Sequence, residues 1–181
     1  MALDADPEVA GVAAQPMWLR WTAESGRLVR HAPDYFARRA DGTAVVIDVR
    51  PDQRIGDQDA AVFAATARLC AQVGWEYQRV GELGAVHAAN LRWLSGYRHP
   101  RFAQPELAVR LGEVFAEGAP LLGGAAAAED PVAVLPVLFG MLWRGELTAE
   151  LERDLLGPAM LVHARGGCAG GRRDPAVRPA G

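Results

Sequence analysis

The stretch that decides the fold is Thr43-Ala44-Val45-Val46-Ile47-Asp48-Val49-Arg50. Its first five residues are apolar or β-branched, and charged residues follow them. A run of this kind predicts a central β-strand that is buried on both faces. Pro51 ends the strand because proline has no N–H to donate to a neighbouring strand.

The segments on either side of this strand predict a compact α/β layer. Upstream, residues 17–22 and 28–38 alternate in character and predict two strands. Downstream, residues 57–73 carry apolar side chains at three- and four-residue spacing, which predicts a helix. A short strand at 75–80 and a second helix at 84–97 follow, and this order of elements is typical of α/β proteins. We assign residues 1–100 to this layer.

The composition changes near residue 100, where His99-Pro100-Arg101 and Gln104-Pro105 mark a boundary. Within residues 101–130, a helix is expected at 106–117 and a Gly/Ala/Pro linker at 118–130. Residues 165–181 contain mostly Gly, Pro and Arg and predict a disordered tail.

Residues 131–164 predict a small helical module. The strongly apolar segment 131–143 reads as a helix, although Pro136 lies inside it. Residues 145–148 read as a helix–turn–helix joint that leads into a second helix at 148–156, and 160–163 as a short strand. The second helix is acidic, which favours packing or protein binding over reading a DNA groove.

Composition excludes several functions. All 19 basic residues are arginine, so Schiff-base chemistry and a Walker-type phosphate loop are excluded. The formal net charge is −3, which argues against a protein held on nucleic acid by bulk positive charge. The two cysteines are far apart, the first residues are acidic, and no apolar run approaches a membrane span. We therefore expect a cytoplasmic protein without a membrane partner.

Two aspartates give the sequence its candidate site. Asp34 and Asp48 lie on neighbouring strands joined by a short turn, so strand alternation can place both side chains on one face at one end of the sheet. Two converging carboxylates suit a hard cation such as Mg²⁺ or Mn²⁺, and the backbone carbonyl of Val49 can add a third ligand. Such an ion lowers the pKa of a bound water and neutralises charge on a phosphate oxygen.

This layout is that of the PD-(D/E)xK nucleases, and residues 4–97 resemble the N-terminal domain of TnsA-like endonuclease subunits of heteromeric transposases. Residues 11–19 look like the entry strand of that family, and residues 31–38 look like its first-acid strand. Asp48-Val49-Arg50-Pro51 stands where the second acid and the basic residue fall. Residues 135–148 resemble, more weakly, the family's winged-helix-like domain.

The resemblance implies a restriction-endonuclease-like core followed by a winged-helix-like module. It implies a DNA endonuclease subunit that cuts phosphodiester bonds at transposon ends, beside a DDE-type transposase subunit and an ATPase regulator. Asp34, Asp48 and Arg50 would be the catalytic residues, and Asp34, Asp48 and Val49 would hold the metal.

The sequence departs from the family at two places. Arg50 stands where the family has lysine, and arginine supplies charge but does not release a proton as a base. The family fold also begins with a helix that carries a metal-binding glutamate, whereas few residues precede the entry strand here and Glu8 does not stand at that place. The first helix is therefore expected to be missing, or to be encoded upstream of Met1.

Two rival interpretations stay open: a non-catalytic assembly subunit with a degenerate nuclease site, and, less favoured, a winged-helix transcription regulator. His31 is read as a packing or hydrogen-bonding residue. Some side chains are possible phosphate contacts, namely Arg38, Arg39 and Arg54. The five tryptophans and Cys70 are read as packing residues.

Overall fold

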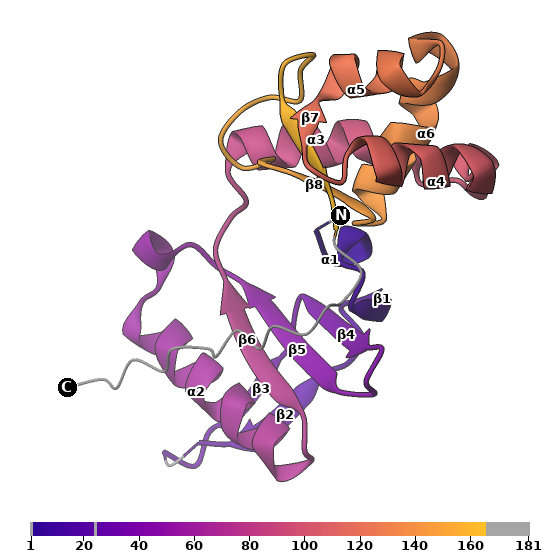
Figure 1. The fold of residues 1–181 in the computed structure, drawn as a ribbon. Coiled ribbons are helices and arrows are strands. Elements are labelled where there is room, and N and C mark those ends of the chain that lie inside the picture. The colour runs from indigo at the N-terminus through magenta and orange to yellow at the C-terminus, as the bar shows by residue number, and fades with distance from the viewer. Residues whose placement is uncertain (1, 24, 166–181) are drawn as a thin grey trace.

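The structure is a computed structural model that describes residues 2–23 and 25–165, and it has two lobes (Figure 1). The first lobe contains helices α1 (Ala2–Ala5) and α2 (Asp57–Gln72), together with two sheets. The second contains helices α3 to α6 and a small sheet. The class is therefore mixed α/β, as the sequence predicts.

The main sheet of the first lobe has the strand order β1-β4-β5-β6. These strands are β1 (Val9–Ala14), β4 (Tyr35–Arg39), β5 (Ala44–Val49) and β6 (Glu76–Val80). β4 is antiparallel to both β1 and β5, whereas β6 is parallel to β5 and follows it through α2. Residues 44–48 are all buried, so the predicted central strand is confirmed.

A separate hairpin of β2 (Leu19–Thr22) and β3 (Leu28–His31) accompanies this sheet. The prediction of one continuous strand over 28–38 is wrong, because the chain breaks between His31 and Tyr35. Pro33 lies in the break, where it removes a backbone donor. The predicted helices at 57–73 and 84–97 correspond to α2 and to α3 (Ala85–Leu94) with the 3₁₀ turn Ser95–Tyr97.

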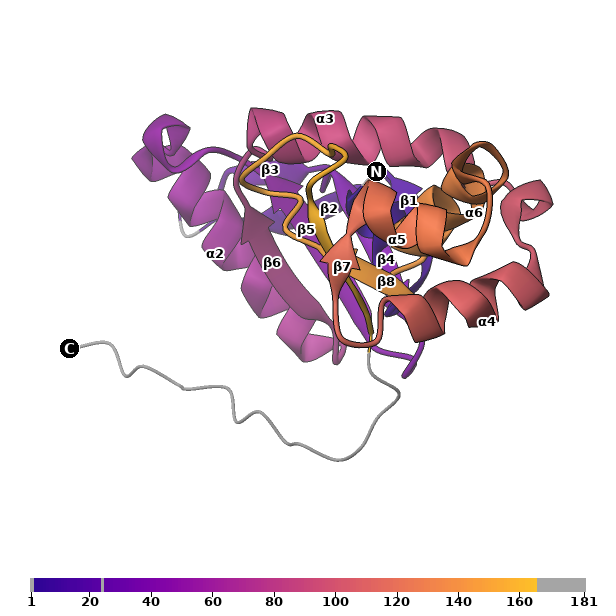
Figure 2. The same ribbon diagram turned by 45° about the horizontal axis from the view of Figure 1, so that its top comes forward.

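The second lobe packs its helices around one apolar cluster, which includes Leu94, Leu111, Phe115, Val137 and Leu138, each at 0% exposure. Figure 2 shows α3 and α4 on either side of α5. The helices after α3 are α4 (Pro105–Val114), α5 (Leu121–Ala128) and α6 (Pro131–Trp143). The strands, in the sheet order β7-β9-β8, are β7 (Ala119–Pro120), β9 (Leu161–Ala164) and β8 (Leu147–Ala149). Two further 3₁₀ turns are Asp52–Arg54 and Pro100–Phe102.

Three predictions for this lobe are wrong. The expected linker at 118–130 contains β7 and α5, because Gly124 lets α5 lie directly against Phe115: a Cβ on Gly124 would stand 2.3 Å from the Phe115 ring. The expected helix at 148–156 is absent, since β8 pairs with β9 there and a loop follows. The helix–turn–helix joint predicted at 145–148 is thus a turn into a strand, while the helices that meet at 119° are α5 and α6.

The two lobes meet at α1 as well as at the connecting residues 81–84. Ala2 and Ala5 pack on the cluster of the second lobe, while Leu3 packs on Ala37, Val45 and Ile47 of the main sheet. In the described residues no single helix is long and apolar enough to cross a membrane, and α5 with α6 reach that length only as a bent pair. All but the first residue of the predicted tail lies outside the described residues.

Candidate functional site

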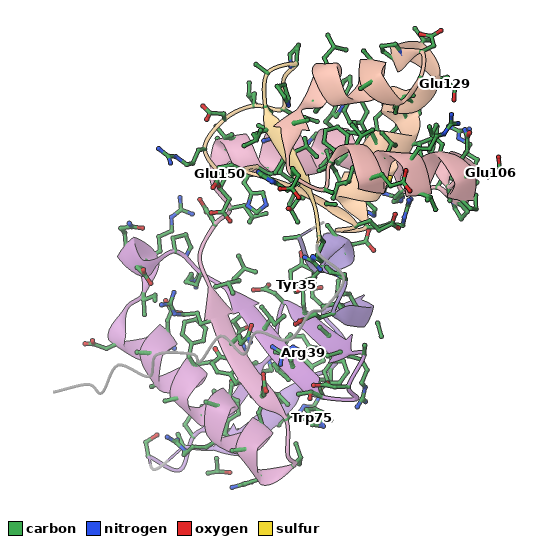
Figure 3. The ribbon with its side chains drawn as sticks, in the orientation of Figure 1. Tyr35, Arg39, Trp75, Glu106, Glu129 and Glu150 are labelled. Atoms are coloured by element: carbon green, nitrogen blue, oxygen red, sulfur yellow. The ribbon has the colours of Figure 1, made fainter. Side chains whose placement is uncertain are left out.

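The two predicted acids lie at the end of the main sheet from which the chain leaves for the second lobe. Asp34 immediately precedes β4, and Asp48 is the penultimate residue of β5. Tyr35 pairs with Ile47, so extending the antiparallel register by one residue sets Asp34 opposite Asp48. Figure 3 shows Tyr35 at this end of the sheet and Trp75 at the other.

A polar cavity of about 310 Å³ brings the predicted residues together. Asp34, Asp48, Val49 and Arg50 all line it. The remaining lining residues come from the end of β3 and from the first turns of α2, namely Arg30, His31, Ala32, Gln58, Asp59, Val62 and Phe63. The site is therefore built from three segments that are distant in the sequence.

Asp48 is the most enclosed acid, with 2% of its surface exposed. His31 Nε2 lies 3.0 Å from its Oδ1 and 2.9 Å from its Oδ2, and the Tyr77 hydroxyl donates to Oδ2 at 2.9 Å. Burial, and then the hydrogen bond to this carboxylate, raise the pKa of Tyr77 far above its ordinary value. The Tyr77 hydroxyl therefore stays protonated as a donor to Asp48.

Asp34 is held by backbone contacts. Its Oδ2 accepts a hydrogen bond of 2.7 Å from the N–H of Val49, and its carbonyl accepts one of 2.9 Å from Gln15. These bonds fix the carboxylate against the end of β5. Val49 therefore contributes its N–H to the site, and the role of its carbonyl as a metal ligand stays a prediction.

Arg50 points to a third carboxylate at the rim. Its Nη2 lies 3.2 Å from Asp59 Oδ1, and Asp59 also receives a weak hydrogen bond, at 3.4 Å, from the N–H of Gly56 at the start of α2. Arg79 donates to the Arg50 carbonyl at 2.9 Å and pairs with Asp52 at 2.6 Å. The cation predicted to face phosphate is thus neutralised locally by Asp59.

Sequence reasoning missed Tyr77 and Asp59 as site residues. Tyr77 pairs with Val46 across the parallel β5–β6 ladder, so its hydroxyl reaches Asp48 two residues along β5. Nothing in the local sequence around Tyr77 signals that contact. Asp59 has a local signal that could have been used, because it is an acid in the first turn of the helix that follows β5 in the chain.

The other predicted residues have mixed outcomes, and the phosphate contacts suggested for Arg38, Arg39 and Arg54 stay predictions; Arg54 lies 3.8 Å from Glu82. His31 makes the expected hydrogen bond, and Cys70 is buried at 2% exposure. Arg39 pairs with Glu76 at 2.8 Å, and Arg38 donates to the Gly42 carbonyl, both near the opposite end of β4. The packing role predicted for every tryptophan is wrong for Trp18, which is 59% exposed, whereas Trp93 packs against Tyr97 and Phe139 although it is 57% exposed.

The donor set suits a hard cation such as Mg²⁺ or Mn²⁺ better than a metal that prefers thiolate ligands. No group of three or more His, Cys, Asp or Glu side chains arranged to hold a metal occurs in the part of the chain that the structure describes. Mg²⁺ needs fewer protein ligands, because it keeps several waters and often binds through one or two carboxylates and a substrate phosphate. Asp34 and Asp48, facing one polar cavity, fit that requirement.

Comparisons with known proteins do not name a family. No protein-family model matches the chain, and no curated protein matches it.

Proposed function

We propose that this chain is a metal-dependent DNA endonuclease subunit of the TnsA-like type, acting on transposon ends together with a DDE-type transposase and an ATPase regulator in the cytoplasm. The observation that carries the proposal is that Asp34, Asp48 and Arg50 line one polar cavity, at the end of the β4–β5 pair where the register, extended by one residue, sets the two acids opposite each other. Carboxylates in this arrangement suit a cation that activates water against a phosphodiester.

The topology supports the proposal. The main sheet has three antiparallel strands, β1, β4 and β5, and a fourth strand, β6, which is parallel to β5 and follows it through the crossover helix α2. This is the core layout expected from the resemblance to the restriction-endonuclease-like nucleases. In the second lobe the order α4-β7-α5-α6-β8-β9 resembles the order expected of a winged-helix module, which would then begin at α4 rather than at residue 131, although α6 presents few polar groups.

Each residue has a role in this proposal. Asp34 and Asp48 would hold Mg²⁺, which supplies a water of lowered pKa and positive charge for the phosphate. Val49 fixes Asp34 through its N–H, and Tyr77 and His31 orient Asp48. Arg50 would turn from Asp59 toward the phosphate and stabilise its developing charge, without acting as a base.

A second function is favoured by the enclosure of Asp48. Its carboxylate already contacts His31 and Tyr77, and Arg50 is paired with Asp59, so these contacts also hold β3, β5, β6 and α2 together. A subunit that keeps these stabilising contacts without cutting DNA would be a non-catalytic member of the transposition complex.

A nicking assay on supercoiled plasmid with Mn²⁺ or Mg²⁺ separates the two functions. The chain is tested alone and with its transposase partner, beside the variants Asp34→Asn and Asp48→Asn and the control Asp41→Asn, which removes an exposed turn carboxylate. The nuclease proposal expects nicking by the wild type and the control only. Equal nicking by all four proteins rejects the site, and assembly without nicking supports the second function.

A further inference from the structure

The hairpin β2–β3 starts beside the candidate site. His31, the last residue of β3, contacts Asp48, and Arg30 and His31 both line the site cavity. The hairpin pairs with no strand of the main sheet. It is therefore a two-stranded ribbon attached at the point where the proposed chemistry takes place.

The ribbon has an inner and an outer face. Leu19, Trp21, Val29 and His31 are partly buried, while the alternate residues are exposed. The exposed residues of the two strands are Arg20, Thr22, Leu28 and Arg30. Trp18, just before β2, is 59% exposed, and the Arg30 guanidinium lies 5.4 Å from the centroid of its ring.

The outer face concentrates positive charge. Arg20 pairs directly with Arg30 across the hairpin, an arrangement of like charges that destabilises a strand pair. Among the described residues neither arginine makes an ion pair of 4.0 Å or less. An anionic ligand would relieve this repulsion, so the face is complementary to a polyanion.

A groove continues this charge along the inner side of the hairpin. A cavity of about 600 Å³ lies between the hairpin and α2 and is lined by Arg27 on one side and Arg68 on the other. It shares Gln58 and Val62 with the site cavity, so the two cavities adjoin. Arg27 and Arg68 thus line the groove, and Arg30 lines the site cavity that adjoins it.

We propose that the β2–β3 hairpin is the arm that binds the sugar–phosphate backbone of duplex DNA next to the site, through Arg20, Arg27 and Arg30, with Arg68 on the facing helix. The overall charge of −3 means that such binding must be local, and this ribbon supplies the local charge. A two-stranded ribbon also has the width that a DNA major groove admits. Delivery of the bound strand to Asp34 and Asp48 rests on the proposed function, whereas the binding itself does not.

Fluorescence anisotropy of a labelled DNA duplex tests the arm in EDTA, where metal-dependent cleavage is absent. The full-length chain is compared with Arg20→Gln/Arg30→Gln and with a control of equal charge change, Arg92→Gln/Arg98→Gln, at exposed positions of the second lobe. We expect weaker binding for the hairpin variant at every salt concentration. Its slope of log K against log[salt] should fall by about 2, since each phosphate contact contributes about 0.9.

Several results would overturn the proposal. Failure of the wild type to bind the duplex at low salt would be one, and an equal loss of DNA affinity in the hairpin and control variants would be another. Duplex RNA that competes more strongly than duplex DNA would be a third such result. A melting temperature of the hairpin variant at or above that of the wild type shows that the loss is not unfolding. The readouts distinguish the two proposals, because weaker DNA binding of the hairpin variant in EDTA supports the arm whether or not the chain nicks DNA in the metal-dependent assay.

Discussion

Removing one hydroxyl from the candidate site tests whether Asp48 is held as a charged, enclosed group. Tyr77→Phe deletes the donor that lies 2.9 Å from Asp48 Oδ2 and keeps the ring. A hydrogen bond to a charged partner contributes ~1.5–3 kcal/mol to stability, and Asp48 is too enclosed for water to replace the donor freely. We therefore expect the free energy of unfolding to fall by ~2 kcal/mol.

The matched control is Tyr97→Phe. Tyr97 is also partly buried and packs against Phe102 and Phe139, with ring centroids 5.3 and 4.9 Å away. Within the described residues its hydroxyl makes no hydrogen bond to a side chain or to the backbone, so its loss should change stability by less than ~0.5 kcal/mol.

Urea unfolding, followed by circular dichroism, measures the difference. With an m-value of ~2 kcal/mol/M, the Tyr77→Phe midpoint should fall by ~1 M while the control stays near the wild type. Equal midpoints for the two variants would refute the argument that Tyr77 stabilises a charged Asp48. Under the proposed function, Tyr77→Phe should also weaken Mn²⁺ binding by about tenfold, because the orienting partner of a ligand is lost.

Three further changes have expected outcomes. Gly124→Ala should destabilise the chain by ~1–3 kcal/mol, because the new Cβ would clash with Phe115. Gly123→Ala, whose Cβ meets only Pro120 at 3.8 Å, should instead stabilise α5 by ~0.5–1 kcal/mol. Changes of melting temperature with the same sign in both variants would contradict this pair of predictions. Asn90→Ala removes three hydrogen bonds of 2.8–2.9 Å to residues 151–156 and should cost ~2–4 kcal/mol, with faster proteolysis of that loop; unchanged cleavage would count against it. Burial, and secondarily the Asp48 charge, raise the pKa of Cys70, so the folded state keeps a proton that the unfolded state releases. The free energy of unfolding should therefore fall as the pH rises through the ordinary thiol range. Cys70→Ala should flatten that dependence in urea titrations between about pH 8 and 10.

The sequence predicts those elements whose pattern is strong by itself. β5 is an uninterrupted apolar run, and α2 shows helical spacing followed by Gly74, whose φ of +72° suits a glycine. The α5 segment carries no comparable signal, because LLGGAAAA reads as a linker until Phe115 is found against its glycine. Tertiary contact, rather than local preference, makes that segment a helix.

The residues of the candidate site also fall into those that the sequence could predict and those that it could not. Asp34, Asp48 and Arg50 could be selected because they fall at strand ends on consecutive segments, where alternation and register bring them to one cavity. Tyr77 could not, since its contact with Asp48 depends on which strand pairs with β5 and in which register. The strands of the ribbon were expected at 17–22 and 28–38, but the separation of β3 from β4 was hidden, because residues 28–38 look continuous until Pro33 interrupts them.

The short helix α1 makes the relation between the lobes a two-point attachment. A single connection through residues 81–84 would let one lobe rotate relative to the other. Ala2 and Ala5 pack against the second lobe, however, while Leu3 packs against the first. Pro7 adds to this brace, with its Cγ 3.3 Å from where a Cβ on Gly145 would lie. Deleting residues 2–7 should therefore leave residues 81–84 as a hinge between the lobes. The angle between the lobes would then vary, and a bound partner could change it.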